Sequence, residues 1–254
     1  MVEILLEAIK YAEAKIRTEW CTKMQIDVNW SPEVSEKLSQ LAICIGLING
    51  VTARKDNEQL RQLKKILYEE VRSKYNIVDL KDDSTVRDYR DFYWKLGIDP
   101  TKTRPAGEAL VRRVLRGDEL PNISTVVDAY NLASVKTMVP MSGFDRDCIA
   151  PPFQVRFARN GEAFTGIGLK APISLTGKIL VLTDRKQVLS IYPYRDSDHT
   201  KIMIETRNVV IVGYGAPGIL RNGLREAVAA ALSLIKQCSG GKIEAAEVFQ
   251  NNSE

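Results

Sequence analysis

Through most of the first half of the chain, apolar residues recur every three or four positions, which is the period of helices with one buried face. The segments with this spacing are residues 1–22, 58–73, 84–96, 107–115 and 123–139. One stretch departs from the pattern, because residues 41–51 (LAICIGLINGV) are almost continuously apolar and rich in β-branched side chains. That composition predicts a core strand.

After Pro140 the pattern changes to glycine, proline and residues that favour strands. In residues 153–168 (FQVRFARNGEAFTGIG), an alternation of apolar and polar residues is broken by Asn160-Gly161, which is a hairpin signal. Further strands are expected at residues 177–182, 188–192 and 209–212, followed by an alanine-rich helix at 220–236. Gly240-Gly241 is expected to end that helix, and the sequence beyond it shows no β-branched run.

A helix-rich half followed by a strand-rich half predicts an α+β fold, with mixed or antiparallel sheets flanked by helices. Residues 31–245 are expected to form a single domain, because no repeat, low-complexity tract or flexible linker divides them. Residues 1–30 are expected to be a helical extension that packs on this domain or joins copies into a homo-oligomer. Residues 246–254 are expected to be a flexible tail.

The composition is that of a globular protein with a sizeable core, with 254 residues, 44% hydrophobic content and a formal net charge of +4. This mild positive excess permits an anionic partner without requiring one. The four cysteines form no CxxC pair, which argues against a zinc site or a disulfide framework. Acidic residues near the N-terminus, and the lack of a run of about 18 apolar residues, favour a cytoplasmic protein that does not associate with membranes.

The stretch richest in function-bearing side chains is Ile191–Tyr214, which reads IYPYRDSDHTKIMIETRNVVIVGY and contains the single histidine. Charges buried there without partners would cost free energy, so they should be satisfied by one another or by a ligand. Asp196 and Asp198, two apart on an extended chain, are expected to point the same way and to hold an amino group or orient water. The structural alternative is an internal salt-bridge network of Asp196, Asp198 and Arg207.

Residues 213–218 (GYGAPG) match the glycine fingerprint of dinucleotide-binding units, between a predicted strand and a helix. Such a unit continues into a second parallel strand that ends in an acidic residue about 20 positions on. The sequence after the helix, SGGKIEAAEVFQNNSE, has no β-branched run of that kind. The motif is therefore interpreted as a glycine-rich turn.

Two long segments resemble one known family. Residues 88–145 (DYRDFYWKLGIDPTKTRPAGEALVRRVLRGDELPNISTVVDAYNLASVKTMVPMSGFD) and residues 194–215 (YRDSDHTKIMIETRNVVIVGYG) are similar to the tRNA-editing domain, the B-three/four domain, of the bacterial phenylalanyl-tRNA synthetase beta subunit. The resemblance implies the fold of that editing domain and hydrolysis of the ester between a wrong amino acid and its tRNA. It implies no metal and no other cofactor. Nothing in the sequence resembles the other modules of the synthetase, so a free-standing deacylase that acts in trans is expected.

An aminoacyl ester is already activated, so its hydrolysis needs a held water, an oriented carbonyl and a place for the developing charge. Asn131 and Ser134, three apart on one helical face, can present a hydrogen-bonding pair. With Asp196 and Asp198 they make up the expected catalytic set. The expected substrate-binding residues are Arg104, Pro105, His199, Thr200, Lys201, Thr206 and Arg207.

Other readings of the same residues stay open. Asn131 is equally compatible with a satisfied core amide. A Ser-His-Asp triad would have to use His199, although the neighbouring Asp198 points to the other face of a strand. The alternative function is a non-catalytic module that binds tRNA or an amino acid, and a small-molecule hydrolase or nucleotide enzyme is a third.

Overall fold

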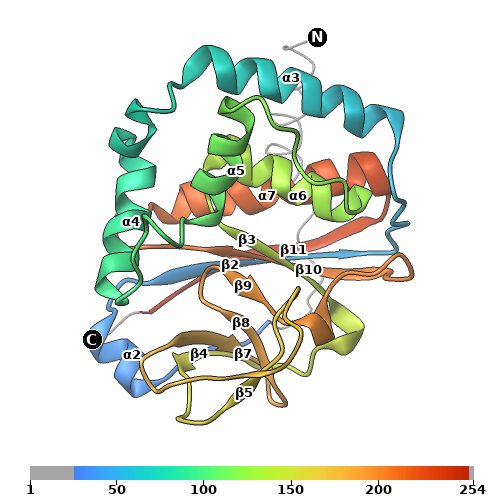
Figure 1. Ribbon diagram of the computed structural model, residues 1–254. Helices are drawn as coiled ribbons and strands as arrows, with labels where there is room; N and C mark the ends of the chain where they lie inside the picture. The colour runs from blue at the N-terminus through green and yellow to red at the C-terminus, as the bar shows by residue number, and fades with distance from the viewer. Residues whose placement is uncertain (1–25, 252–254) are drawn as a thin grey trace.

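A four-stranded antiparallel sheet, the central sheet, runs through the middle of the molecule in the computed structural model, which describes residues 26–251 (Figure 1). Its strands lie in the order β11-β2-β10-β3. Their bounds are Ala42–Asn49 for β2, Met141–Asp145 for β3, Asn208–Tyr214 for β10 and Lys242–Gln250 for β11. Among the described residues, β3 pairs along its length with β10 and otherwise makes a single bridge from Phe144 to Lys201, so it forms one edge of this sheet.

Helices cover one face of the central sheet (Figure 1). Helix α6 (Thr125–Thr137) precedes β3, and α7 (Arg221–Ser239) joins β10 to β11. In both units the two parallel strands are separated by an antiparallel one, which is the split βαβ arrangement of ferredoxin-like folds. The connection from β2 to α6 adds an outer helical layer of α3 (Glu58–Lys74), η1 (Asp79–Asp82), α4 (Ser84–Lys95) and α5 (Ala106–Leu115).

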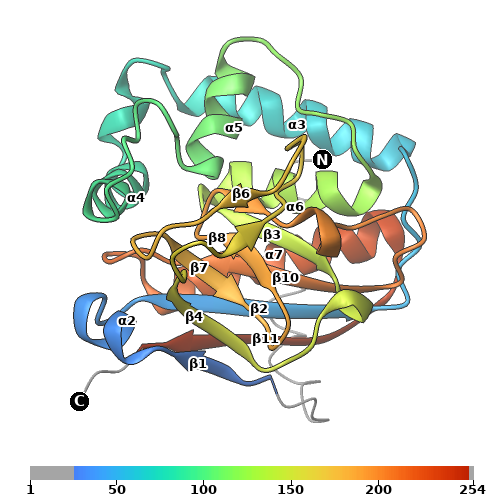
Figure 2. The same ribbon diagram turned by 60° about the horizontal axis from the view of Figure 1, so that its bottom comes forward.

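A second sheet packs on the other face of the central sheet, in the order β1-β4-β7-β8-β9. Its strands are β1 (Val28–Trp30), β4 (Phe153–Phe157), β7 (Leu180–Thr183), β8 (Val188–Ile191) and β9 (Arg195–Asp196). All except β1 come from the segment between β3 and β10. The short elements are α2 (Pro32–Lys37), η2 (Arg146–Cys148), η3 (Asp198–Thr200) and the β5 (Ala163–Phe164) and β6 (Ile173–Ser174) pair, which covers part of the outer face (Figure 2).

Strand β2 is apolar from Ala42 to Ile48 because both of its faces are covered. Ile43, Ile45 and Leu47 face the second sheet, whereas Cys44 and Ile48 face the helices. This two-sided burial explains the continuous apolar run of residues 41–51 that predicted a core strand. It also makes the central sheet the common wall of the two large hydrophobic cores.

Buried ion pairs join the helices of the outer layer to one another and to α6. Lys64 on α3 donates to the fully buried Asp128 of α6 at 2.6 Å. Glu108 on α5 accepts from Arg90 of α4 at 2.8 and 2.9 Å and from Arg112 at 2.6 Å. Burial alone would raise the pKa of the Glu108 carboxyl, but the two guanidinium groups outweigh it and hold the pKa below its usual value.

The α+β prediction is confirmed, and the expected helices at 58–73, 84–96, 107–115, 123–139 and 220–236 correspond to α3 to α7. The hairpin predicted at Asn160-Gly161 is wrong, although Gly161 does adopt a positive φ of 82° in a turn. Strand β4 pairs with β1 and β7, while β5 pairs with β6, so the strands on either side of this turn are not partners.

The expected domain limits at both ends need correction. Residues 28–30 form β1, which pairs with β4, so they belong to the second sheet and not to a helical extension. At the other end, β11 runs to Gln250, and Asn251 is buried with its amide donating to the carbonyls of Val34 and Leu38. The proposed helix at residues 1–22, and any homo-oligomer contact through it, lie outside the described residues. No helix within residues 26–251 is long and apolar enough to cross a membrane.

Two helical glycines allow the contact between α5 and α6 to be tested. A Cβ on Gly107 of α5 would lie 2.3 Å from the backbone oxygen of Met138, whereas a Cβ on Gly223 of α7 meets nothing within 4 Å. Gly107→Ala should therefore destabilise the protein by about 1–3 kcal/mol, because the helix must move away from its neighbour. Gly223→Ala, the matched control, should stabilise it by up to about 1 kcal/mol through helix propensity. Urea unfolding measures both, and equal effects of the two changes would contradict the close contact.

Candidate active site

Five polar side chains gather at the β3 edge of the central sheet, where it meets the second sheet and α6. We call them the Asp196 cluster. They are Ser142 on β3, Ser190 on β8, Asp196 on β9, Tyr214 on β10 and Tyr130 on α6. The two serines and the two tyrosines are buried. The cluster is therefore a group of polar side chains within a largely apolar interface.

Hydrogen bonds fix one side of the Asp196 carboxyl. Ser142 Oγ donates to Asp196 Oδ1, and Ser190 lies opposite Asp196 in the β8–β9 pairing. The Ser190 hydroxyl in turn shares a 2.6 Å hydrogen bond with the hydroxyl of Tyr214. Asp196 itself is half-buried, and its Oδ2 neither bonds to a described residue nor is sealed from solvent.

The electrostatics of the cluster set Asp196 apart from an ordinary surface carboxylate. Burial raises the pKa of Asp196 to about 7, although the hydrogen bond from Ser142 acts in the opposite direction. None of the ion pairs formed within residues 26–251 includes Asp196. Burial, reinforced by the charge of Asp196, also raises the pKa of the Tyr130 and Tyr214 phenols, so both stay protonated at neutral pH.

The position of Tyr130 depends on a glycine in β3. A Cβ on Gly143 would lie 2.5 Å from Cε1 of Tyr130 and 2.8 Å from Cδ1 of Ile202. The missing side chain at Gly143 therefore lets the Tyr130 ring approach the edge strand closely. Beyond it, Lys201 forms an isolated bridge with Phe144, which brings η3 to the same edge.

The expected pairing of Asp196 with Asp198 is not found, because the chain leaves the extended conformation and enters η3 at Asp198. Asp198 forms an ion pair of 2.8 Å with Lys201 at the surface. Arg207 is exposed and donates to the carbonyls of Ile204 and Thr206. The alternative of one network containing Asp196, Asp198 and Arg207 is therefore also wrong.

Some of the other predicted site residues are bonded within the fold, and others have side chains without a hydrogen-bond partner among the described residues. The Thr206 hydroxyl donates to Asp145 at 2.6 Å and accepts from the Met203 amide, so it holds a loop together. Pro105 is buried and caps the start of α5. His199 is exposed, with only its backbone N–H bonded, to Ser197 Oγ. By contrast, Thr200 Oγ1 and Arg104 Nε are buried donors that find no partner among the described residues.

The expected pair on α6 also separates into two roles. Asn131 follows Tyr130, is half-buried, and has a side-chain amide that makes no hydrogen bond within residues 26–251. The Ser134 hydroxyl is buried and donates to the carbonyl of Val139 at 2.7 Å. Ser134 is thus committed to the end of its own helix, and it does not form a ligand-facing pair with Asn131.

A family model described as "B3/4 domain" matches residues 88–240, which is more than half of the 254-residue chain. The chain belongs to the B3/4 domain family. The match begins within α4 and runs through α5, α6, β3, the second sheet from β4 onwards, β10 and α7, so all five members of the Asp196 cluster lie inside it.

Relatives of this B3/4 domain are much longer proteins. The phenylalanine-tRNA ligase beta subunit of Yersinia pestis is 33% identical over 102 residues, which cover 40% of this chain and 13% of that protein. The same subunit of Haemophilus ducreyi is 29% identical over 114 residues, covering 44% and 14%. An N-terminal fragment of the phenylalanyl-tRNA synthetase beta subunit from Pyrococcus horikoshii matches with a TM-score of 0.48 and 16% identity, over 87% of this chain and 51% of that one.

Four members of the Asp196 cluster were not predicted from the sequence of this B3/4 domain. Ser142 and Ser190 are buried polar residues within the mainly apolar strands MSGFD and VLSI, and such interruptions of an apolar run are the available signal. In the sequence alone, Tyr130 and Tyr214 cannot be told from ordinary core aromatic residues, because only the packing of the folded chain brings them to Asp196.

The pKa of Asp196 predicts an unusual pH dependence of stability in the B3/4 domain. The folded state holds this proton up to a pH of about 7, whereas the unfolded chain releases it near the ordinary value of 3.8. Stability should therefore fall as the pH rises between these values and level off above them. Between pH 5 and pH 8 the wild type should lose about 2 kcal/mol relative to Asp196→Asn. Urea unfolding at both pH values measures this, and Asp198→Asn, the control, should follow the wild type.

The hydrogen bond of Ser134 predicts a purely structural effect. Ser134→Ala would leave the buried Val139 carbonyl without its donor and should cost about 1 kcal/mol of unfolding free energy. Ser134→Thr keeps a hydroxyl at this position and serves as the control. An unchanged melting temperature for Ser134→Ala would contradict the role assigned here.

Proposed function

We propose that this chain is an aminoacyl-tRNA deacylase, which removes a wrongly attached amino acid from tRNA that another enzyme has charged. The observation that carries the proposal is the Asp196 carboxyl. It is half-buried, has no cationic partner among the described residues, keeps one oxygen open, and has a pKa of about 7. A carboxylate that gains and loses a proton near neutral pH is suited to general base catalysis. Membership of the B3/4 family supports an ester of tRNA as the substrate.

The proposed reaction uses water as the nucleophile. Ionised Asp196 accepts a proton from a water molecule while the oxygen of that water bonds to the ester carbonyl carbon. The bond between that carbon and the ribose oxygen then breaks, and the proton passes to the departing oxygen. The products are a free amino acid and an intact tRNA. The step needs no protein nucleophile, and the proposal assigns no part in it to a metal or cofactor.

Neighbouring side chains take supporting roles in this proposal. Ser142 orients the carboxyl through Oδ1, which leaves Oδ2 for water. Tyr130, kept protonated by its raised pKa, is assigned to donate to the developing oxyanion. The Asn131 amide, next along α6, is assigned to hold the substrate. The unpaired donors of Thr200 and Arg104, together with Lys201 and His199, are assigned to the terminal nucleotide.

Substituting Asp196 tests the proposal directly. Asp196→Asn should lower the rate of deacylation of the preferred misacylated tRNA at least about 100-fold, because the general base is lost. Asp198→Asn is the matched control at a neighbouring carboxylate that already has a cationic partner, and it should retain most of the activity. The assay is release of labelled amino acid from a panel of misacylated tRNAs. Tight tRNA binding without turnover by the wild type would instead support a non-catalytic binding module.

The pH profile provides an independent check. After subtraction of the enzyme-free rate, kcat/KM should rise with pH and level off above about 7, following ionisation of Asp196. Ser142→Ala removes the hydrogen bond that lowers the pKa of the Asp196 carboxyl, so the rise should move to higher pH. A profile that does not change in this variant would exclude Asp196 as the base.

A further inference from the structure

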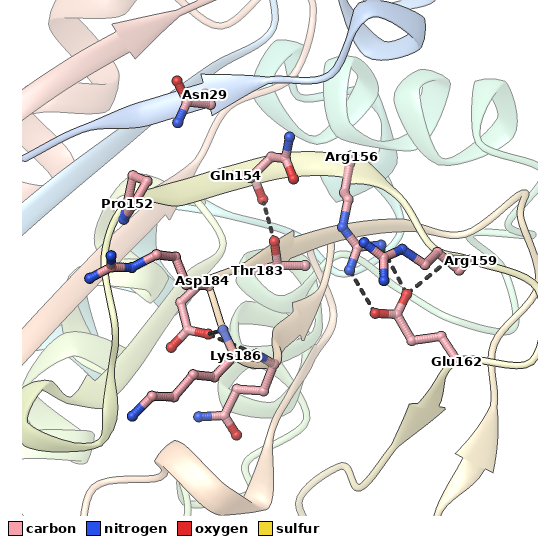
Figure 3. A pocket seen from close by; sticks show the side chains of 11 residues that line it. Asn29, Pro152, Gln154, Arg156, Arg159, Glu162, Thr183, Asp184 and Lys186 are labelled. Carbon is pink, nitrogen blue, oxygen red and sulfur yellow. Dashed lines mark hydrogen bonds and ion pairs between the residues drawn. The ribbon is translucent and has the colours of Figure 1, made fainter.

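A polar cavity, separate from the Asp196 cluster, opens on the outer face of the second sheet (Figure 3). It has a volume of about 290 Å³. Phe153 and Val155 of β4 face the core, so the alternate residues Gln154 and Arg156 point outward into this cavity. The turns at residues 159–162 and 184–187 form its walls. We call it the basic groove.

Both carboxylates of the groove are already satisfied. Glu162 accepts from the Arg156 guanidinium at 2.6 and 2.9 Å, a bidentate pair that neutralises one charge of each sign. Asp184 accepts from the backbone amides of Ala150, Lys186 and Gln187 at 2.7 to 2.8 Å. These acidic groups therefore shape the walls and do not need a cation from a ligand.

Three cationic side chains remain uncommitted. Arg159, Arg185 and Lys186 are exposed, and none forms an ion pair with a residue in the range 26–251. Arg159 and Lys186 lie on opposite sides of the cavity (Figure 3). Cations on two separate walls suit a chain of several anionic groups better than a single small anion.

The rest of the lining narrows the class of ligand. The side-chain amides of Gln154 and Asn29 face the groove and are not engaged by a described residue, which adds neutral hydrogen-bond donors. No aromatic side chain is among the residues of the lining, so the groove offers no aromatic ring on which bases can stack. A nucleic-acid contact made of cations and amide donors without stacking is one to phosphates and sugars, which carries affinity but little sequence preference.

We propose that the basic groove binds the sugar-phosphate backbone of tRNA. The identity of this RNA rests on the proposed function, whereas the phosphate chemistry rests on the groove alone. In the strand order β1-β4-β7-β8-β9, the groove lies towards β1 and β4 and Asp196 lies on β9 at the other end. The body of the tRNA is thus held on one end of the sheet while its esterified terminus is treated at the other.

Charge reversal in the groove tests this proposal in the full chain. The variant Arg159→Glu, Arg185→Glu, Lys186→Glu should raise the Kd for a deacylated tRNA at least about tenfold at 0.1 M salt, because phosphate contacts are lost. The slope of log Kd against log salt should fall by about 2 to 3, roughly one for each lost contact. Fluorescence anisotropy across a salt series measures both quantities.

A matched triple separates a specific site from general charge. Arg87, Lys95 and Arg221 are also two arginines and one lysine, all exposed on α4 and α7. Their reversal to Glu changes the net charge equally and should leave the Kd within about threefold of the wild type. Equal losses in the two triples, or no loss in the groove triple, would overturn the proposal. Binding of polyglutamate or of anionic lipid vesicles in preference to tRNA would also overturn it.

A neutral version protects the test against a folding defect. This triple variant is Arg159→Gln, Arg185→Gln, Lys186→Gln. It should keep the melting temperature of the wild type and still lower the slope of log Kd against log salt. Because deacylated tRNA is the probe, binding is measured without turnover. If the wild type does not deacylate tRNA but the groove triple loses tRNA binding, the groove proposal stands and the deacylase proposal fails. If the wild type deacylates tRNA but the groove triple binds tRNA as tightly as the wild type, the deacylase proposal stands and the groove proposal fails.

Discussion

The fold depends on packing the two sheets against each other across β2 and β10. Because these strands are covered by helices on one face and by the second sheet on the other, the central sheet is shared by both large cores. The second sheet is formed mainly by the segment between β3 and β10, so both of those strands connect directly to it. Any residue placed at the β3 edge therefore lies at the meeting point of all three layers.

That meeting point gives the Asp196 cluster its chemistry. Two serines and two tyrosines come from four separate elements, and their packing shields one side of a carboxyl from water without supplying a cation. A charge in this setting is costly, so the group titrates near neutral pH where an exposed aspartate would not. Asp198 lies only two residues further along the chain, but a turn of 3-10 helix places it at the surface, where it forms an ion pair with Lys201.

Much of the fold was predictable because its main signals are local. The apolar run of β2 and the helical spacing of α3 to α7 are properties of single segments. Partners are not local, so the turn at Asn160-Gly161 was predicted whereas the pairing of β4 with β7 was not. Strand β11 was missed because KIEAAEVFQ has weak β propensity and is a strand through backbone pairing with β2. In the site, Asp196 was found from charge density, but Ser142 and Ser190 join it only through tertiary packing.

The short length of β9 has a consequence for dynamics. Asp196 is held in its environment by a strand of two residues, and the central sheet contributes Ser142 and Tyr214 from across the interface. If the sheets move apart, the shielded side of the carboxyl also meets water, its pKa falls, and its proton leaves at neutral pH. Protonation and sheet docking are then one linked equilibrium, so the ionisation state of a single side chain reports how tightly the two halves of the molecule are closed.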